Sequence, residues 1–287
     1  MNIKTEINNF DLSKRIILIG DGWGAVSAFK SLKKLPNPIT VLTDDDDILA
    51  EKPDRIINLE GLKNELLIFA GYKPIVPIEI LENNNCINIH YSLLPTYRGL
   101  HSTVWAILND EPKLGLTIHL MDQFIDNGPI LYQYAIENDF TKTSCEYMKL
   151  FNNHIEENLY KVIQDFIENK ITPVPQNKSK ASWVGRRKQT DCRIDFNKTI
   201  NYQKAFFRAL VKPYPLPYFE HKGNEYRVTK VDFHKSDIST HKGRILNIDN
   251  EGLWVKIQDG YMIIKEIMDC SNKPVSLDRF MIGMFLN

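Results

Sequence analysis

The sequence has little of what marks the more specialised classes of protein. Its 287 residues include four cysteines, and none of these has the close spacing of a metal clip, so a disulfide scaffold and a cysteine-based metal site are both unexpected. No apolar run approaches the roughly 18 residues that span a bilayer. Lysine plus arginine and aspartate plus glutamate each number 36, so no net charge draws the chain to nucleic acid or to an anionic membrane.

What is present is the composition of an ordinary globular protein. Hydrophobic residues make up 43% and charged residues 25%, which excludes wholesale disorder. The length suits two domains better than one. Residues 1–6 show no apolar core of a signal peptide, and the scattered cysteines suit a reducing compartment. We therefore expect a soluble, cytoplasmic protein.

Short apolar runs alternate with helix-sized intervals in the first half of the chain. The predicted strands cover residues 16–19, 39–42, 66–70, 86–90 and 115–120. Apolar runs that end at glycine, such as the first and the third, are typical of strands buried on both faces of a parallel sheet. The sequence therefore predicts an α/β fold with a Rossmann-like, mostly parallel sheet.

The pattern changes in the second half of the chain. Apolar residues at helical spacing predict one long helix over residues 148–169, followed by a linker rich in Pro, Asn, Lys and Ser over residues 172–182. A helix over residues 202–211 and four short strands with glycine turns then predict a smaller, OB-like β-barrel. We place the boundary after residue 185, with an N-terminal domain of 1–185 and a C-terminal domain of 186–287.

A glycine-rich segment, Gly20 to Ala25, follows the first predicted strand and precedes a predicted helix. It fits the Gly-x-Gly-x-x-Ala form of a dinucleotide-binding loop, and Asp44 follows the second strand where a ribose-binding acid would lie. Three interpretations stay open: a tight turn, a loop whose backbone N–H groups bind the phosphate of another ligand, or the nucleotide site of an oxidoreductase. The run from Asp44 to Asp47 is interpreted as a solvated loop rather than a metal site.

Two polar residues stand near the end of the fourth predicted strand. Asn88 and His90 are two positions apart, so their side chains point to one face. An amide donor beside an imidazole at the carboxyl end of a strand suits acyl transfer, and a merely satisfied polar edge is the alternative. Further on, a glycine-containing loop carries Asp122 and Asp126. A carboxylate there either orients a histidine or caps the loop.

Together these stretches resemble the formyltetrahydrofolate-dependent formyltransferase family. The motifs are Asn-x-His at residues 88–90, the loop 92–95, Tyr-Arg-Gly at 97–99 and Asp-Asn-Gly at 126–128, preceded by Phe-Ala-Gly-Tyr at 69–72. The resemblance covers most of residues 65–135 and continues more weakly to the region of Gly260. The family has two branches with this two-domain layout, the methionyl-tRNA formyltransferases and the sugar-nucleotide N-formyltransferases.

The resemblance implies transfer of a formyl group from N10-formyltetrahydrofolate, without a metal. It implies that Asn88 donates a hydrogen bond to the oxyanion, that His90 moves the proton, and that Asp126 orients His90. For the folate pocket it implies Phe69, Gly71, Tyr72, Ser92, Leu93, Leu94, Pro95, Asp122 and Ile125. The candidate contacts to the other substrate are Gly22, Trp23, Lys73, Tyr97, Arg98 and His101.

The expected acceptor is a nucleotide-linked amino sugar. The tRNA branch carries a basic insertion after the first helix, whereas this chain has only Lys33 and Lys34 there, followed by four aspartates that would repel phosphates. Leu100, followed by His101, stands where the UDP-aminoarabinose enzymes have a basic residue. This favours a dTDP-linked sugar such as dTDP-4-amino-4,6-dideoxyglucose, used for O-antigen and lipopolysaccharide synthesis.

Three alternatives to this function are kept. They are a methionyl-tRNA formyltransferase, an NAD-dependent oxidoreductase built on the glycine loop, and a folate-binding protein without activity. The expected partners are the sugar nucleotide and the folate, with no nucleic-acid or membrane partner. A homodimer is left open.

Overall fold

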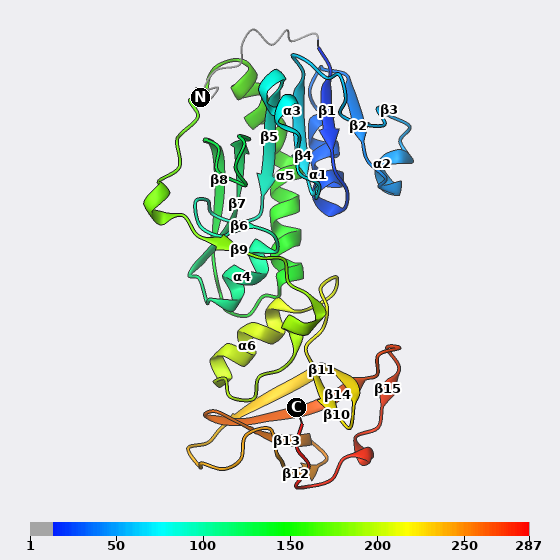
Figure 1. The fold of residues 1–287 in the computed structure, drawn as a ribbon, viewed down its shortest axis with the longest axis vertical. Helices are drawn as coiled ribbons and strands as arrows, with labels where there is room; N and C mark the ends of the chain where they lie inside the picture. Colours follow the sequence, from blue (N-terminus) through cyan, green and yellow to red (C-terminus); the bar gives the residue numbers. More distant parts are fainter. Residues whose placement is uncertain (1–13, 287) are drawn as a thin grey trace. The chain divides into compact units, whose positions relative to one another are not determined.

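The computed structural model describes residues 14–286, which divide into two compact units (Figure 1). One unit comprises the chain up to Ala106 together with Pro112–Asn138 and Glu146–Gly185. The other comprises Ile107–Glu111, Asp139–Cys145 and the chain from Arg186 onward. Residues 1–6, which carry the prediction about a signal peptide, lie outside the described residues.

The first unit is built on a seven-stranded sheet with the order β3-β2-β1-β4-β5-β7-β8. Its strands are β1 (Ile16–Ile19), β2 (Ile39–Leu42), β3 (Asp54–Arg55), β4 (Leu66–Ala70), β5 (Asn85–His90), β7 (Lys113–Leu120) and β8 (Ile130–Glu137). Pairing is parallel from β3 to β5, whereas β7 runs antiparallel to both β5 and β8. The predicted mostly parallel α/β sheet is confirmed.

Burial explains why the central strands read as unbroken apolar runs. Every residue of β1 and of β4 is buried, so both faces of these strands are covered. The helices that belong wholly or mostly to this unit are α1 (Trp23–Leu32), α2 (Asp46–Leu49), α3 (Ile78–Asn83), α4 (Ser102–Leu108) and α5 (Ser144–Ile167). Even α5 is amphipathic, and no helix within residues 14–286 is both long and apolar enough to cross a membrane.

The stretch predicted as a linker does more than connect two domains. It contains a 3-10 turn, η1 (Lys178–Lys180), and leads directly into the short strand β9 (Trp183–Val184), which pairs in parallel with β6 (Arg98–Gly99) (Figure 1). Earlier in the same stretch, Val174 and Ile130 exchange two backbone hydrogen bonds of 2.8 Å. We call residues 174–184 the strap, because they hydrogen-bond to two separate loops of the first unit.

The second unit is mainly an antiparallel sheet. Its order is β10 (Tyr218–His221), β11 (Asn224–Lys235), β14 (Gly260–Met268), β13 (Gly252–Ile257) and β12 (Ile245–Asp249), with β15 (Pro274–Val275) paired to β14. The unit also contains α6 (Ile200–Ala209) and the short turns η2 (Gln189–Cys192) and η3 (Leu277–Arg279). Leu253, Val255, Met262 and Ile264 alternate inward and are fully buried. The expected C-terminal β domain is confirmed as an antiparallel one.

Candidate active site

The carboxyl-terminal half of β5 carries the polar pair singled out in the sequence. Asn88 is half-buried and His90 is buried, and the intervening Ile89 points to the other face. Because β5 is flanked by β4 and β7, the register places Asn88 between Phe69 on one side and His119 on the other. The amide and the imidazole therefore project from a strand whose backbone is fixed by neighbours on both sides.

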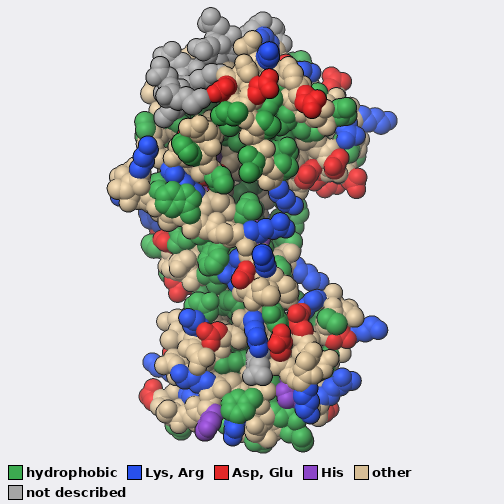
Figure 2. Space-filling model, viewed as in Figure 1, with side chains coloured by type: hydrophobic (Ala, Val, Ile, Leu, Met, Phe, Trp, Pro, Cys, Tyr) green, Lys and Arg blue, Asp and Glu red, His purple; other side chains and the backbone are tan. Residues whose placement is uncertain are grey.

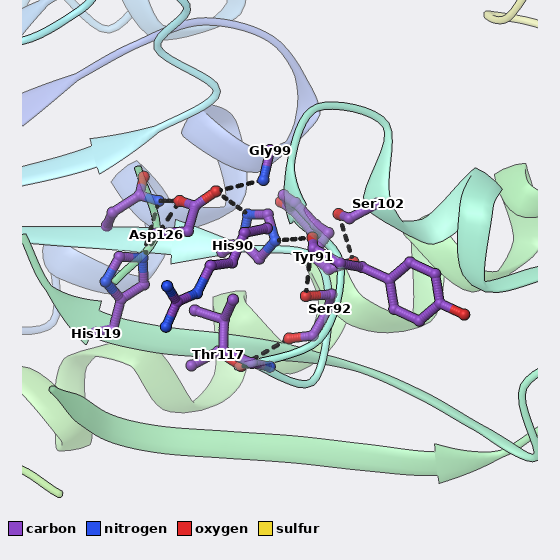
Figure 3. A network of polar contacts seen from close by, with 12 residues as sticks. His90, Tyr91, Ser92, Gly99, Ser102, Thr117, His119 and Asp126 are labelled. Atoms are coloured by element: carbon purple, nitrogen blue, oxygen red, sulfur yellow. Dashed lines mark hydrogen bonds and ion pairs between the residues drawn. The ribbon is translucent and has the colours of Figure 1, made fainter. Parts of the chain in front are cut away.

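Asp126 reaches this strand end from the loop between β7 and β8. Its Oδ2 lies 3.5 Å from His90 Nδ1, and its Oδ1 lies 3.3 Å from Asn88 Nδ2 (Figure 3). The backbone N–H of Gly99 donates to the same carboxylate at 2.8 Å. The backbone of Asp126 adopts a left-handed φ of 49°, which aspartate tolerates better than most residues. The structure therefore brings the three predicted catalytic side chains into contact.

A fourth side chain, which the sequence analysis did not single out, completes this cluster. His119 is fully buried, and its Nε2 lies 3.2 Å from Asn88 Nδ2 and 3.6 Å from Asp126 Oδ1. Its Nδ1 lies 2.7 Å from the carbonyl oxygen of Leu120, so in the neutral ring Nδ1 carries the proton and Nε2 accepts from Asn88. Strand alternation could have placed His119 on one face of β7, but only the antiparallel pairing brings that face beside Asn88.

Burial and charge act on the two titratable groups in different ways. Burial lowers the pKa of His90 below its ordinary value, although the Asp126 carboxylate and the Tyr97 carbonyl oppose this shift. Burial alone would raise the pKa of Asp126, but its contacts with the His119 and His90 rings and with the N–H of Gly99 outweigh burial, and the pKa falls to about 2. At neutral pH the cluster therefore holds a carboxylate beside a neutral imidazole.

The hydrogen bonds of His90 indicate which ring nitrogen is basic. Its Nε2 lies 2.9 Å from the carbonyl oxygen of Tyr97, which accepts and cannot donate, so Nε2 carries the proton. Nδ1 is then the unprotonated nitrogen, and it faces Asp126. A proton that arrives at Nδ1 would be stabilised at once by the carboxylate.

The residues predicted to line a folate pocket differ in how much side chain they expose. Phe69, Ser92 and Leu94 are buried, Tyr72, Leu93, Pro95 and Asp122 are half-buried, and Gly71 and Ile125 are exposed. The side chain of Phe69 is buried in a hydrophobic cluster, so this residue offers a ligand its backbone only. Ile125 is 65% exposed and adjoins Asp126. Contact of these residues with a folate stays a prediction.

The residues predicted to contact the other substrate are also dispersed. Trp23 and Lys73 are exposed, and Tyr97 and His101 are half-buried. Arg98, in contrast, is buried, and its two terminal nitrogens donate to Asn127 Oδ1 at 2.9 Å and to Gln176 Oε1 at 2.7 Å. The guanidinium is thus committed to protein groups on both sides.

The glycine loop between β1 and α1 is tied to the aspartate run. The N–H of Gly22 donates to Asp45 Oδ2 at 2.9 Å, and Asp45 also caps α2 by accepting from the N–H of Asp47. Asp21 accepts from Thr43 Oγ1 and from the N–H of Asp44. Because a carboxylate takes the loop N–H that a phosphate would use, this geometry favours the tight turn over a dinucleotide site.

The structure also bears on whether the run from Asp44 to Asp47 could be a metal site. Across residues 14–286, no group of three or more His, Cys, Asp or Glu side chains is arranged to hold a metal ion. Figure 2 shows acidic side chains gathered near α2, and Asp44, Asp46 and Asp47 are exposed there. The aspartate run therefore places negative charge on the surface beside the glycine loop.

Family models match both halves of the chain. A model described as formyl transferase matches residues 40–163, and one described as formyl transferase, C-terminal domain, matches residues 186–284. The first covers Asn88, His90, His119 and Asp126. Both matches agree with the resemblance seen in the sequence motifs.

Individual relatives extend this comparison. A methionyl-tRNA formyltransferase of Clostridium novyi is 28% identical over 237 residues, or 82% of this chain and 76% of the relative. One of Nitratiruptor sp. is 30% identical over 226 residues, or 78% and 72%. Among solved structures, an N-formyltransferase from Helicobacter canadensis, in complex with folinic acid and dTDP-3-aminofucose, is similar with a TM-score of 0.67 at 22% identity, covering 88% of this chain and 98% of that one.

Proposed function

This chain belongs to the formyl transferase family, and from that premise we propose that it moves a formyl group from N10-formyltetrahydrofolate to the amine of a nucleotide-linked amino sugar. The observation that carries the reaction is the cluster of Asn88, His90 and Asp126 at the end of β5. An amide donor, a neutral imidazole and a carboxylate are the groups that acyl transfer to an amine requires.

The proposed mechanism assigns each group one task. The amine attacks the formyl carbon, and Asn88 Nδ2 donates to the oxyanion, a contribution of about 3–4 kcal/mol in comparable sites. His90 takes the amine proton at Nδ1 and returns it to the leaving nitrogen of the folate. Asp126 stabilises the charged ring during the transfer.

The hydrogen bonds of Asn88 support this role at the oxyanion. Its Nδ2 has two N–H groups, which contact His119 at 3.2 Å and Asp126 at 3.3 Å. The contact with Asp126 is the longer one, and Asp126 turns toward His90 once that ring is charged. In our proposal the formyl oxygen then replaces Asp126 as the partner of this N–H, while His119 keeps the other N–H.

The proposed folate site lies along the loop that carries Asp126. Phe124 and Ile125 of this loop are 62% and 65% exposed, and such apolar side chains suit the face of a pterin ring. The similar N-formyltransferase from Helicobacter canadensis was solved with folinic acid, which supports a folate co-substrate. We propose no metal for this reaction, since proton transfer and oxyanion stabilisation are supplied by side chains.

For the acceptor we favour a dTDP-linked amino sugar, with dTDP-4-amino-4,6-dideoxyglucose as the example and O-antigen synthesis as the context. The acidic surface near α2 and the zero net charge oppose the phosphate contacts that tRNA binding requires. The complex of the Helicobacter canadensis protein with dTDP-3-aminofucose supports a nucleotide sugar. Methionyl-tRNA is the second candidate, because the relatives from Clostridium novyi and Nitratiruptor sp. bear that name.

The test is a formyl-transfer assay of the full chain with N10-formyltetrahydrofolate and a panel of acceptors. The panel contains dTDP-3-amino and dTDP-4-amino sugars, UDP-4-aminoarabinose and methionyl-tRNA, and mass spectrometry detects the formylated product. We expect a dTDP-amino sugar to react and the rate to change little between about 50 and 200 mM salt, where a tRNA enzyme loses orders of magnitude in affinity. Formylation of methionyl-tRNA alone would exclude the sugar. Stabilisation by NAD but not by 5-formyltetrahydrofolate would point to an oxidoreductase.

We also propose that the enzyme works in the cytoplasm, where scattered thiols remain reduced. A homodimer is the assembly that we propose to examine first, by measuring the molar mass in solution by light scattering.

A further inference from the structure

One buried amide of the strap holds the backbone around Asp126. Gln176 is buried, and its Nε2 donates to the carbonyl oxygens of Asp126 at 2.9 Å and of Gly128 at 2.8 Å. Its Oε1 accepts from Arg98 at 2.7 Å. Every polar atom of this amide is therefore engaged, and both of its N–H groups serve the loop that carries Asp126.

Arg98 closes a ring of hydrogen bonds around the same loop. One of its terminal nitrogens donates to Gln176 and the other to Asn127, whose amide in turn donates to Asp122 at 2.5 Å. The residue after Arg98 is Gly99, whose N–H donates to the Asp126 carboxylate. Gln176 thus holds the main chain of Asp126, and the N–H of Gly99 holds the carboxylate of Asp126.

The loop buries little apolar surface that could fix its backbone. Asp126 adopts a left-handed backbone, which is strained for a residue other than glycine. The side chains of its neighbours Phe124 and Ile125 are exposed and so bury little apolar surface. The two backbone hydrogen bonds between Val174 and Ile130 fix the strap to the start of β8, so Gln176 acts from a secured segment.

We propose that Gln176 is a positioning residue of this enzyme, which holds the Asp126 carboxylate against His90 through the carbonyls of Asp126 and Gly128. Arg98 orients Gln176 and Asn127. The inference rests on the proposed function in assuming that Asp126 acts during formyl transfer.

Loss of Gln176 has a consequence for His90 that a general loss of stability would not have. When the carboxylate moves away, His90 loses the negative neighbour that opposes the effect of burial on its pKa. The other groups that face His90 are the Tyr97 carbonyl, in the loop between β5 and β6, and the His119 ring on β7, and none of the three hydrogen bonds of Gln176 goes to either group. The imidazole should then titrate at a lower pH.

The experiment combines an NMR titration with a double-mutant cycle in the full chain. Gln176→Leu removes the three hydrogen bonds with little change in volume, and Asn177→Ala is the matched control, because its side chain bonds only to Ser179. We expect Gln176→Leu to lower the titration midpoint of the His90 ring and to reduce kcat about tenfold, but less than about twofold when Asp126→Asn is already present. Asn177→Ala should change neither.

The proposal would be overturned if Gln176→Leu reduced kcat by the same factor in the native enzyme and in the Asp126→Asn variant. An unchanged titration midpoint of His90 in Gln176→Leu would also overturn it. The titration needs no substrate, so it tests the role of Gln176 even if the substrate that receives the formyl group has been assigned wrongly. If Gln176→Leu does not fold, Gln176→Asn keeps the amide but is one methylene too short to reach both carbonyls, and the same two outcomes apply to it.

Discussion

Asn88 and His119 face each other across the β5–β7 ladder, with Asn88 Nδ2 3.2 Å from His119 Nε2. Because Nδ1 of His119 faces the carbonyl oxygen of Leu120, the neutral ring carries its proton there and offers Nε2 as an acceptor. An acceptor at this place selects the orientation of the amide, with its nitrogen rather than its oxygen toward the cluster. The oxyanion donor is therefore oriented before any ligand arrives.

This orientation predicts a graded response to substitution of His119. His119→Leu removes the acceptor, so the amide of Asn88 is free to turn, and we expect kcat to fall about tenfold with a smaller change in KM. His119→Gln can still accept through its side-chain oxygen and should lose less. Steady-state kinetics of both variants would check this. Identical losses would mean that His119 contributes volume and not an acceptor.

The three side chains assigned to catalysis carry the largest expected effects. Asn88→Ala, His90→Ala and Asp126→Ala should each reduce turnover by about two orders of magnitude or more, because each removes a group that acts on the transition state. Asn85→Ala, at the other end of β5, is the control and should retain turnover. Thermal unfolding should show that all four variants remain folded. A His90→Ala enzyme with near-normal turnover would eliminate His90 as the proton carrier.

The pKa directions predict the acid side of the activity profile. His90 must be neutral to accept a proton, and burial lowers its pKa, so the acid limb of kcat/KM should lie below about pH 6.5. Asp126→Asn removes the main influence that raises this pKa, so the limb should move to still lower pH while kcat falls. His234→Gln, in the second unit, should leave the limb in place. A limb that moved upward in Asp126→Asn would contradict the assignment of His90.

The acceptor amine and the folate titrate as well, but they are the same in every variant. The shift between native enzyme and Asp126→Asn, rather than the absolute position of the limb, is therefore the quantity to compare.

Two glycines of the first unit offer a matched pair. Gly99 has a φ of +104°, and a Cβ added there would lie 2.3 Å from the carbonyl oxygen of Val184. Gly99→Ala should therefore displace the N–H that serves Asp126, lowering both turnover and stability, the latter by on the order of 1–3 kcal/mol. Gly185→Ala meets nothing within 4 Å and should be close to neutral. Denaturant unfolding and kcat of both variants would decide, and an active, stable Gly99→Ala would disprove the argument.

Local patterns in the sequence were enough to predict the central strands but not β8. The runs in β1 and β4 are buried on both faces, and an unbroken apolar run is a strong local signal. Strand β8 alternates between partly buried and exposed positions over most of its length, and the sequence analysis assigns residues 132–137 to no element. The antiparallel β7, and with it the place of His119, depends on pairing between strands that no local pattern reveals.

Long-range hydrogen bonds also explain what the sequence did not reveal about the site. Arg98 is predicted to contact the sugar nucleotide because a pyrophosphate needs positive groups, and that contact stays a prediction; within the protein its terminal nitrogens donate to Asn127 and Gln176, two partners that the sequence does not reveal. The polar composition of residues 172–182 predicted a linker, whereas some of those polar groups complete hydrogen bonds in the site. Polar residues with distant partners look the same in sequence as polar residues in water.

The strap also sets the moment at which the active site can form during synthesis of the chain. Arg98 and Gln176 are 78 residues apart, and Tyr97 bonds to Ser182 over 85 residues. Contacts over such separations form late, because a long loop must close before they contribute. A ribosome-bound chain that has exposed β5, β7 and the loop of Asp126 still lacks the residues that fix Asp126. Such a chain would hold Asn88, His90 and Asp126 without their final geometry until the strap emerges.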